Sequence, residues 1–241
     1  MKILALESTA LTASAALCEE ETVLGEITLN HGNTHSETLL PMVEFLLGQF
    51  RMKVPEIGLF AVTTGPGSFT GIRIGVSTIK GLAFGTGIPC VGVSAPEALA
   101  DRLALSPGLI CPVMNARRNQ VYTALFRSDG NVPQRLLPDS VMSLEALNLV
   151  LSEYREPVHL CGDGYALATQ ALSVPLVPAP ESVRVPSAVS VARVARRMRD
   201  AGACISDREL SPIYLRAPQA ERERAERLSH TKISFTERNP I

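Results

Sequence analysis

Residues 63–85 read TTGPGSFTGIRIGVSTIKGLAFG, and this stretch decides how the first half of the chain folds. The apolar run Leu59–Val62 leads into Gly-Pro-Gly, and Ser68 then stands where a helix N-cap would. Because glycine tolerates backbone angles that other residues resist, the sequence predicts a strand, a tight turn and a helix. Such a turn either receives a phosphate at the helix N-terminus or lets two helices pack at short range, with Gly71 and Gly75 leaving a groove for the other backbone. The sequence leaves both interpretations open.

The composition is that of an ordinary folded protein. The chain has 241 residues, of which 46% are hydrophobic and 20% charged, and its formal net charge is −1. The length allows two modest domains, and the near-zero charge gives no global electrostatic case for nucleic-acid binding. Arginines are concentrated between Arg193 and Arg227, but acids are interleaved with them. This pattern favours a solvated helix face and tail, with direct nucleic-acid contact as the alternative.

Cysteine usage and the N-terminal sequence indicate a reducing compartment. The five cysteines are widely spaced and form no C-x-x-C pair, so they predict neither a disulfide framework nor a zinc knuckle. The N-terminus reaches Glu7 after four apolar residues, too few for a signal peptide, and no apolar run is long enough to cross a bilayer. We therefore expect a cytoplasmic protein that does not associate with a membrane.

Two successive blocks of the chain have the same order of predicted elements. Residues 1–105 read as three strands followed by helix, strand, helix, strand and helix. After a Ser-Pro-Gly break, residues 106–216 open with three strands again and continue with helices and a strand, and the proline-rich stretch 174–186 is expected to be irregular. This duplication predicts a two-domain actin-like (ASKHA) α/β fold with a reduced second domain. Each domain is expected to open with three antiparallel strands followed by αβα, and residues 217–241 are expected to form a polar, disordered tail.

The element boundaries follow from the apolar patterns. The predicted strands are Ile3–Leu6, Ser14–Glu19, Thr22–Leu29, Leu59–Thr63, Cys90–Val93, Leu109–Asn115, Val121–Arg127, Val132–Leu137 and Val158–Cys161. The predicted helices are Glu37–Phe50, the helix after the glycine turn, Pro96–Leu105, Leu144–Tyr154, a short helix after Gly164, and Ser187–Ala201.

The motifs of common nucleotide and hydrolase sites are missing from the sequence. The glycine turn is one residue longer than the dinucleotide fingerprint, and the chain contains neither a phosphate-loop lysine motif nor a nucleophile elbow. In an actin-like fold Glu7 and Asn115 follow equivalent strands, where a nucleotidase would need carboxylates for Mg²⁺. The neutral Asn115 disfavours an ATPase, so we expect no catalytic residue. A vestigial nucleotide site would comprise Glu7, Thr9, Gly65, Gly67, Ser68 and Asn115.

Two histidines have the spacing of a helical metal-binding pair. His31 and His35 lie four residues apart, but the intervening Gly32 and Asn33 disfavour a helix. No third ligand follows nearby beyond Glu37. We interpret both as capping or surface histidines and expect no metal site.

Two predicted helices of the first block have apolar side chains on more than one face. A single core needs one apolar stripe per helix, whereas Leu40, Met42 and Phe45 extend the apolar surface of Glu37–Phe50 beyond that stripe. Surplus apolar surface beside small residues is typical of a protein interface. The alternative is that loops or the C-terminal segment cover this surface within the chain.

Several of these stretches resemble one protein family. The segments MKILALESTA, HSETLLPMVEFLL, GPGSFTGIRIGVSTIKGLAFG, IPCVGVSAPEAL, MNARRNQVY and PIYLRAP are similar to those of the bacterial TsaB (YeaZ) family, over nearly the whole chain up to about Arg216. The resemblance implies an actin-like fold and a non-catalytic subunit that dimerises with and activates a TsaD-type transferase. That transferase makes threonylcarbamoyladenosine next to the anticodon of tRNA, and a TsaE-type ATPase completes the complex.

The resemblance also implies a docking surface and a set of partners. In the family the two first-domain helices pair with the same helices of TsaD, or of a second copy when the protein is alone, and tRNA is reached through the complex. No cofactor is required by the chain itself, and ATP or ADP would bind at the complex interface. The implied interface residues are Leu39, Leu40, Met42, Val43, Leu46, Gly71, Ile72, Gly75, Val76 and Ile79.

The related transferase TsaD has a metal-binding H-x-E-G-H motif after its glycine turn. In this chain Ala95-Pro96-Glu97-Ala98-Leu99 stands at the corresponding place, so both histidines are replaced. Without imidazoles this segment cannot hold the metal, so the resemblance implies an accessory subunit and gives no support to a peptidase. The alternative is a stand-alone actin-like ATP-binding phosphotransferase or hydrolase.

Overall fold

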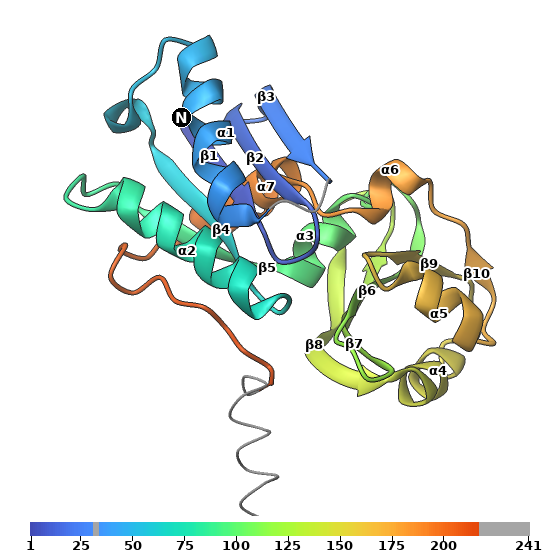
Figure 1. The fold of residues 1–241 in the computed structure, drawn as a ribbon. Helices are drawn as coiled ribbons and strands as arrows, with labels where there is room; N and C mark the ends of the chain where they lie inside the picture. The colour runs from blue at the N-terminus through green and yellow to red at the C-terminus, as the bar shows by residue number, and fades with distance from the viewer. Residues whose placement is uncertain (31–33, 217–241) are drawn as a thin grey trace, which may run out of the picture.

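The computed structural model describes residues 1–30 and 34–216, which form an α/β protein with two sheets (Figure 1). The first sheet contains β1 (Lys2–Glu7), β2 (Ala13–Glu19), β3 (Thr22–Leu29), β4 (Leu59–Gly65) and β5 (Cys90–Ser94). The second contains β6 (Gly108–Asn115), β7 (Gln120–Ser128), β8 (Gln134–Ser143), β9 (Val158–Cys161) and β10 (Leu176–Val177). The helices are α1 (His35–Gln49), η1 (Val54–Glu56), α2 (Phe69–Ala83), α3 (Ala95–Asp101), α4 (Leu144–Ser152), α5 (Tyr165–Ala171), α6 (Glu181–Arg184) and α7 (Ala188–Asp200).

The two sheets have the same topology. The strand orders are β3-β2-β1-β4-β5 and β10-β9-β6-β7-β8, so that β1 and β6 hold equivalent central positions. β1 is antiparallel to β2 and parallel to β4, and β6 is antiparallel to β7 and parallel to β9. The internal duplication and the two-domain actin-like fold are confirmed.

Helices cover both faces of each sheet. α1 and α2 pack on one face of the first sheet and α7 on the other, because the alternating side chains of β1 are apolar on both sides. α4 and α5 pack on the outer face of the second sheet, and α3 covers its inner face. α3 and α7 contact each other between the sheets (Figure 1).

Two helices, α3 and α7, each pack on the sheet of the other predicted domain. α3 precedes the expected boundary at residue 105 but packs mainly on the second sheet, whereas α7 follows that boundary and packs on the first. The limits 1–105 and 106–216 therefore describe the repeat along the sequence, and the two halves interlock in space. The predicted tail, residues 217–241, lies outside the described residues.

Three local predictions need correction. The helix predicted over Pro96–Leu105 ends at Asp101 as α3, and residues 102–105 form turns. β8 begins at Gln134 rather than at Val132 and extends to Ser143, because its second half pairs with the start of β7. The stretch 174–186 is not wholly irregular, since β10 pairs in parallel with β9 and α6 follows. Pairing with β9 and the packing of Leu176 against the apolar cluster of the second sheet support this two-residue strand, which is too short to give an apolar pattern.

Four of the five cysteines are buried. All five cysteines are free thiols, and burial raises the pKa of Cys18 and Cys90 to about 11 and that of Cys111 to about 12. None of the helices in residues 1–30 and 34–216 is long and apolar enough to span a bilayer.

Candidate functional site

The glycine turn joins β4 to α2 as the sequence predicts. The Ser68 hydroxyl accepts a hydrogen bond from the Gly71 N–H at 3.3 Å and so caps α2. The N–H of Ser68 donates to the Thr9 carbonyl at 2.7 Å, which ties the turn to the loop after β1. Gly65 and Gly67 have φ values of 126° and 156°, a region that side-chain-bearing residues avoid.

The small residues of α2 pack against the chain's own loop after β1. A Cβ atom at Gly71 would overlap the Ser8 carbonyl oxygen, and one at Gly75 would overlap the Ser8 hydroxyl. The Ser8 hydroxyl also donates to the Gly71 carbonyl at 2.8 Å. Gly71 and Gly75 are therefore close-packed, but against a loop of the same chain and not against a second helix as the helix-packing interpretation expects. Gly71 and Gly75 are not available as interface residues.

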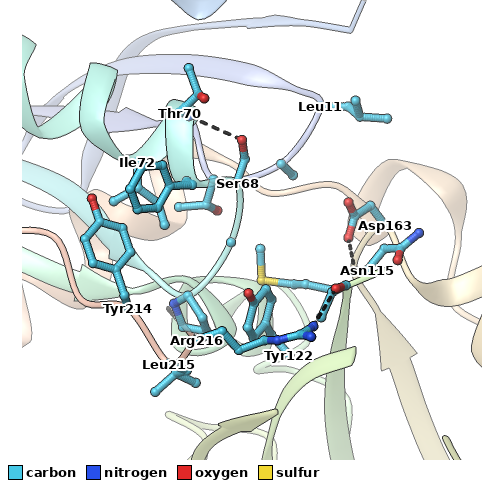
Figure 2. A pocket seen from close by; sticks show the side chains of 18 of the residues that line it. Leu11, Ser68, Thr70, Ile72, Asn115, Tyr122, Asp163, Tyr214, Leu215 and Arg216 are labelled. Atoms are coloured by element: carbon cyan, nitrogen blue, oxygen red, sulfur yellow. Dashed lines mark hydrogen bonds between the residues drawn. The ribbon is translucent and has the colours of Figure 1, made fainter. Parts of the chain in front are cut away.

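A cleft of about 600 Å³ lies between the domains, near the carboxyl ends of the equivalent strands β1 and β6 (Figure 2). One wall is formed by the loop after β1 and the first turn of α2, and the other by the end of β6 and the loop after β9. Residues 213–216 line it as well. The predicted vestigial site is divided by this geometry: Thr9, Gly67, Ser68 and Asn115 line the cleft, whereas Glu7 and Gly65 are buried and do not.

Glu7 is a fully buried carboxylic acid. Its Oε1 accepts hydrogen bonds from the Thr9 N–H at 2.6 Å and from the Thr9 hydroxyl at 2.5 Å. Its Oε2 and the Thr63 hydroxyl are both buried without a hydrogen-bond partner, although Thr63 lies near enough to lower the pKa of Glu7. Desolvation outweighs these effects and raises the pKa of Glu7, and the negative charge of Asp163 raises it further.

Asp163 is a residue of the cleft that the sequence reasoning missed. Its Oδ1 accepts a hydrogen bond from the Asn115 N–H at 2.9 Å (Figure 2). The side chain reaches solvent, yet neighbouring groups desolvate it enough to raise its pKa. The signal for it was present: Gly162-Asp163-Gly164 follows β9, the repeat's equivalent of β4, just as the glycine turn follows β4.

Of the two strand-end residues expected to bind Mg²⁺, neither is a good ligand, and the carboxylate that does line the cleft is that of Asp163. Glu7 is inaccessible and holds its proton more tightly than an ordinary acid, and Asn115 is neutral. Within residues 1–30 and 34–216, no three His, Cys, Asp or Glu side chains gather closely enough to hold a metal ion. His35 is the first residue of α1, and its Nε2 lies 2.9 Å from the Ala10 carbonyl. His31 lies outside the described residues.

The predicted interface residues prove to be mostly core. Leu40 is 45% exposed. The buried members are Leu39, Met42, Val43, Leu46, Gly71, Ile72, Gly75, Val76 and Ile79. The seven of them with larger side chains belong to one apolar cluster with the first sheet, because α1 and α2 both direct these stripes toward it. Their assignment to a surface is therefore wrong.

The outer surfaces of α1 and α2 contain a different apolar set. Leu40 and Phe45 are the exposed large apolar side chains of α1 before its last turn, 45% and 57% exposed, and Ile74 of α2 is half-buried. Gly48 and Gly81 are exposed and have open space where a Cβ would be. We call these five residues, which lie on two helices in contact, the α1–α2 face.

The arginines of α7 are paired with acids. The ion pairs join Arg193 and Arg197 to Asp101, Arg196 to Glu21, and Arg199 to Glu20. This arrangement agrees with a neutralised helix face rather than a basic patch for nucleic acid. The arginines after residue 216 lie outside the described part of the chain.

The segment that stands in place of the transferase metal motif lies inside the molecule. Ala95 is 1% exposed and Leu99 0%, and both pack in the apolar cluster between α3 and the second sheet. Two buried apolar side chains therefore stand at the positions that correspond to the two histidines of the TsaD motif.

Comparison with known proteins agrees with this architecture. The family model of TsaD, tRNA N6-adenosine threonylcarbamoyltransferase, matches residues 22–197. The tRNA threonylcarbamoyladenosine biosynthesis protein TsaB of Bacillus subtilis is 36% identical over 172 residues, which are 71% of this chain and 75% of that relative. TsaB of Escherichia coli is 28% identical over 220 residues, 90% of this chain and 95% of that relative.

Solved structures show the same fold. YeaZ from Pseudomonas aeruginosa superposes with a TM-score of 0.75 at 23% identity, and the match covers 89% of this chain and 99% of that one. A second structure from that organism, described as similar to the peptidase YeaZ, gives a TM-score of 0.78 at 24% identity, with the same coverage. By its identity to the Bacillus relative the chain belongs to the TsaB (YeaZ) family, and the TsaD family model also matches more than half of it.

Proposed function

We propose that this protein is a non-catalytic subunit in the synthesis of tRNA threonylcarbamoyladenosine, and that it binds and activates a TsaD-type transferase. The relatives named TsaB support the pathway. The single observation that carries the docking role is the exposed α1–α2 face, which has apolar side chains beside open glycines. Glycines allow another helix to approach closely, and exposed Leu and Phe side chains supply apolar area to bury.

The same face would serve a homodimer when the transferase is absent. Both partners would bury Leu40 and Phe45, so the two assemblies would compete for one surface. A TsaE-type ATPase and tRNA would join through the complex, since the arginines of α7 are already paired. Any ATP or ADP would bind at the complex interface.

Charge substitution on the α1–α2 face tests this proposal. Leu40→Glu and Phe45→Glu place a carboxylate in an apolar contact, so each is expected to weaken binding to the transferase at least tenfold without unfolding the chain. Leu149→Glu is the matched control, because Leu149 is an exposed leucine on α4, in the other domain. Isothermal titration calorimetry and circular dichroism would measure affinity and folding. Equal affinities for all three variants would contradict the proposed face.

A second candidate function is a stand-alone ATP-dependent phosphotransferase or hydrolase. The observation that favours it is the cleft between the domains, and the poor ligand set at Glu7 and Asn115 opposes it. Calorimetric titration of the isolated chain with Mg²⁺-ATP discriminates the two, because tight binding or turnover would support the enzyme.

A further inference from the structure

The last described segment, residues 204–216, forms a strap along α2 (Figure 1). Ile205 exchanges two backbone hydrogen bonds with Cys90 of β5, at 2.8 and 2.9 Å. Leu210 is buried in the core under α1 and α2, and the Lys80 ammonium donates to the Leu210 carbonyl at 2.9 Å. The strap is therefore an integral part of the first domain.

The strap approaches the cleft beside the glycine turn. The N–H of Ile213 donates to the Thr64 carbonyl at 2.8 Å, and a Cβ at Gly65 would overlap the Ile213 carbonyl oxygen. The ring of Tyr214 then stacks on Phe69, the first residue of α2, with centroids 4.7 Å apart. Arg73 lies over the Phe69 ring and donates from Nε to the Tyr214 hydroxyl at 2.8 Å. The strap thus holds the first turn of α2 through its aromatic ring.

At its end the strap crosses to the second domain. Arg216 donates from Nη1 to the Ala116 carbonyl at 2.9 Å (Figure 2). Ala116 opens the turn between β6 and β7, in which Arg117, Arg118 and Asn119 all have positive φ, between 53° and 61°. Three successive left-handed residues without glycine are costly, so neighbouring contacts must hold the turn in place.

Two stretches that are remote in the sequence therefore meet across the cleft. The MNARRNQVY segment supplies the left-handed turn, and the PIYLRAP segment supplies Tyr214 and Arg216. Neither is used by docking on the α1–α2 face alone. Their contact makes one continuous path from α2 through the strap to the β6–β7 turn.

We infer that the strap is a latch between the domains, which couples events on α2 to the conformation of the β6–β7 turn through Tyr214 and Arg216. A partner that shifts the first turn of α2 moves the Phe69–Tyr214 stack, and Arg216 transmits that movement to the Ala116 carbonyl. The coupling to a partner rests on the proposed function, whereas the latch itself is a property of the isolated chain.

Hydrogen exchange on the isolated chain tests the latch. The Ala116 N–H bonds to the Gln120 carbonyl and the Gln120 N–H to the Arg117 carbonyl, so both amides report on the turn. Arg216→Ala is expected to raise their exchange rates about five- to tenfold, because it removes the hydrogen bond to the Ala116 carbonyl that opposes local opening. Tyr214→Ala is expected to raise them in the same direction, because it releases the strap segment that carries Arg216 from α2. Arg127→Ala, which removes an ion pair to Glu156 near the opposite end of β7, is the control and is expected to change neither rate. Unchanged rates in both latch variants would overturn the inference.

A second set of hydrogen-exchange measurements is made on the chain in complex with the TsaD-type transferase. Binding to the wild-type chain is expected to change exchange at Ala116 and Gln120 at least threefold, and Tyr214→Ala is expected to abolish this change while still binding. Protection of α1 and α2 with no effect on the turn would overturn the coupling. Absence of any complex would contradict the proposed function instead, and the isolated-chain arm would still decide whether the latch exists.

Discussion

Glu7 shows how a single buried group makes the stability of the protein depend on pH. Desolvation raises its pKa in the folded chain, while the unfolded chain exposes it to water. Glu7 has its ordinary pKa in the unfolded chain and a higher pKa in the folded chain. As the pH rises from the lower of these values toward the higher, the unfolded chain therefore releases the Glu7 proton first. The contribution of Glu7 to the free energy of unfolding therefore falls over this range, and the loss is complete above the folded pKa.

Glu7→Gln is expected to remove the fall in the free energy of unfolding that Glu7 causes as the pH rises. The amide oxygen can still accept from Thr9, and no buried charge forms, so the variant should lose less stability than the wild type as the pH rises from 4 to 7.5. Urea unfolding between pH 4 and 8 would measure it, with the exposed Glu44→Gln as control. Parallel pH profiles for wild type and Glu7→Gln would contradict this account.

The glycines of α2 give a second prediction at the scale of residues. Gly71→Ala is expected to destabilise the chain by about 1–3 kcal/mol, because the new methyl group overlaps the Ser8 backbone despite the better helix propensity of alanine. Gly81→Ala, at an open position of the same helix, is expected to stabilise it by about 0.5–1 kcal/mol. Thermal unfolding of both variants provides the comparison. Equal shifts would show that Gly71 is not close-packed.

At the scale of elements, α1 and α2 illustrate what periodicity can and cannot decide. The apolar pattern correctly predicts two helices with a stripe toward the sheet. It does not decide which surplus side chains remain outside, because Met42 and Phe45 are both apolar and both lie off the predicted stripe. In the structure Met42 is buried and Phe45 is exposed. Tertiary packing settles this choice, and one sequence contains no signal for it.

Charged substitutions at Val76 and Leu40 test which side chains of α1 and α2 face the core. Val76 is 3% exposed, so Val76→Arg places an unpaired charge in the core and is expected to abolish cooperative folding. Leu40→Glu is expected to keep the wild-type circular dichroism spectrum and to shift the melting temperature by only a few degrees. Cooperative unfolding of Val76→Arg near the wild-type temperature would refute the assigned orientation of α2.

At the scale of the whole molecule, the duplicated order of elements predicts both sheets and their facing arrangement. The repeat also places Glu7 and Asn115 at equivalent strand ends, where the cleft lies. What the sequence does not reveal are contacts between distant segments. Asp163 does have a signal in the repeat, because its loop after β9 corresponds to the glycine turn after β4. The sequence contains no such signal for the exchange of sheets by α3 and α7 or for the contact of Arg216 with Ala116. Each depends on how the two domains pack, which local patterns do not encode.

The most direct test of the central claim is size-exclusion chromatography with light scattering, applied to this protein alone and mixed with the TsaD-type transferase of its own organism. The eluted complex would then be assayed for threonylcarbamoyl transfer to tRNA with the other components of the pathway present. A stable one-to-one complex that supports transfer is expected, with no transfer when either subunit is omitted. No complex at micromolar concentrations, or equal transfer without this protein, would contradict it.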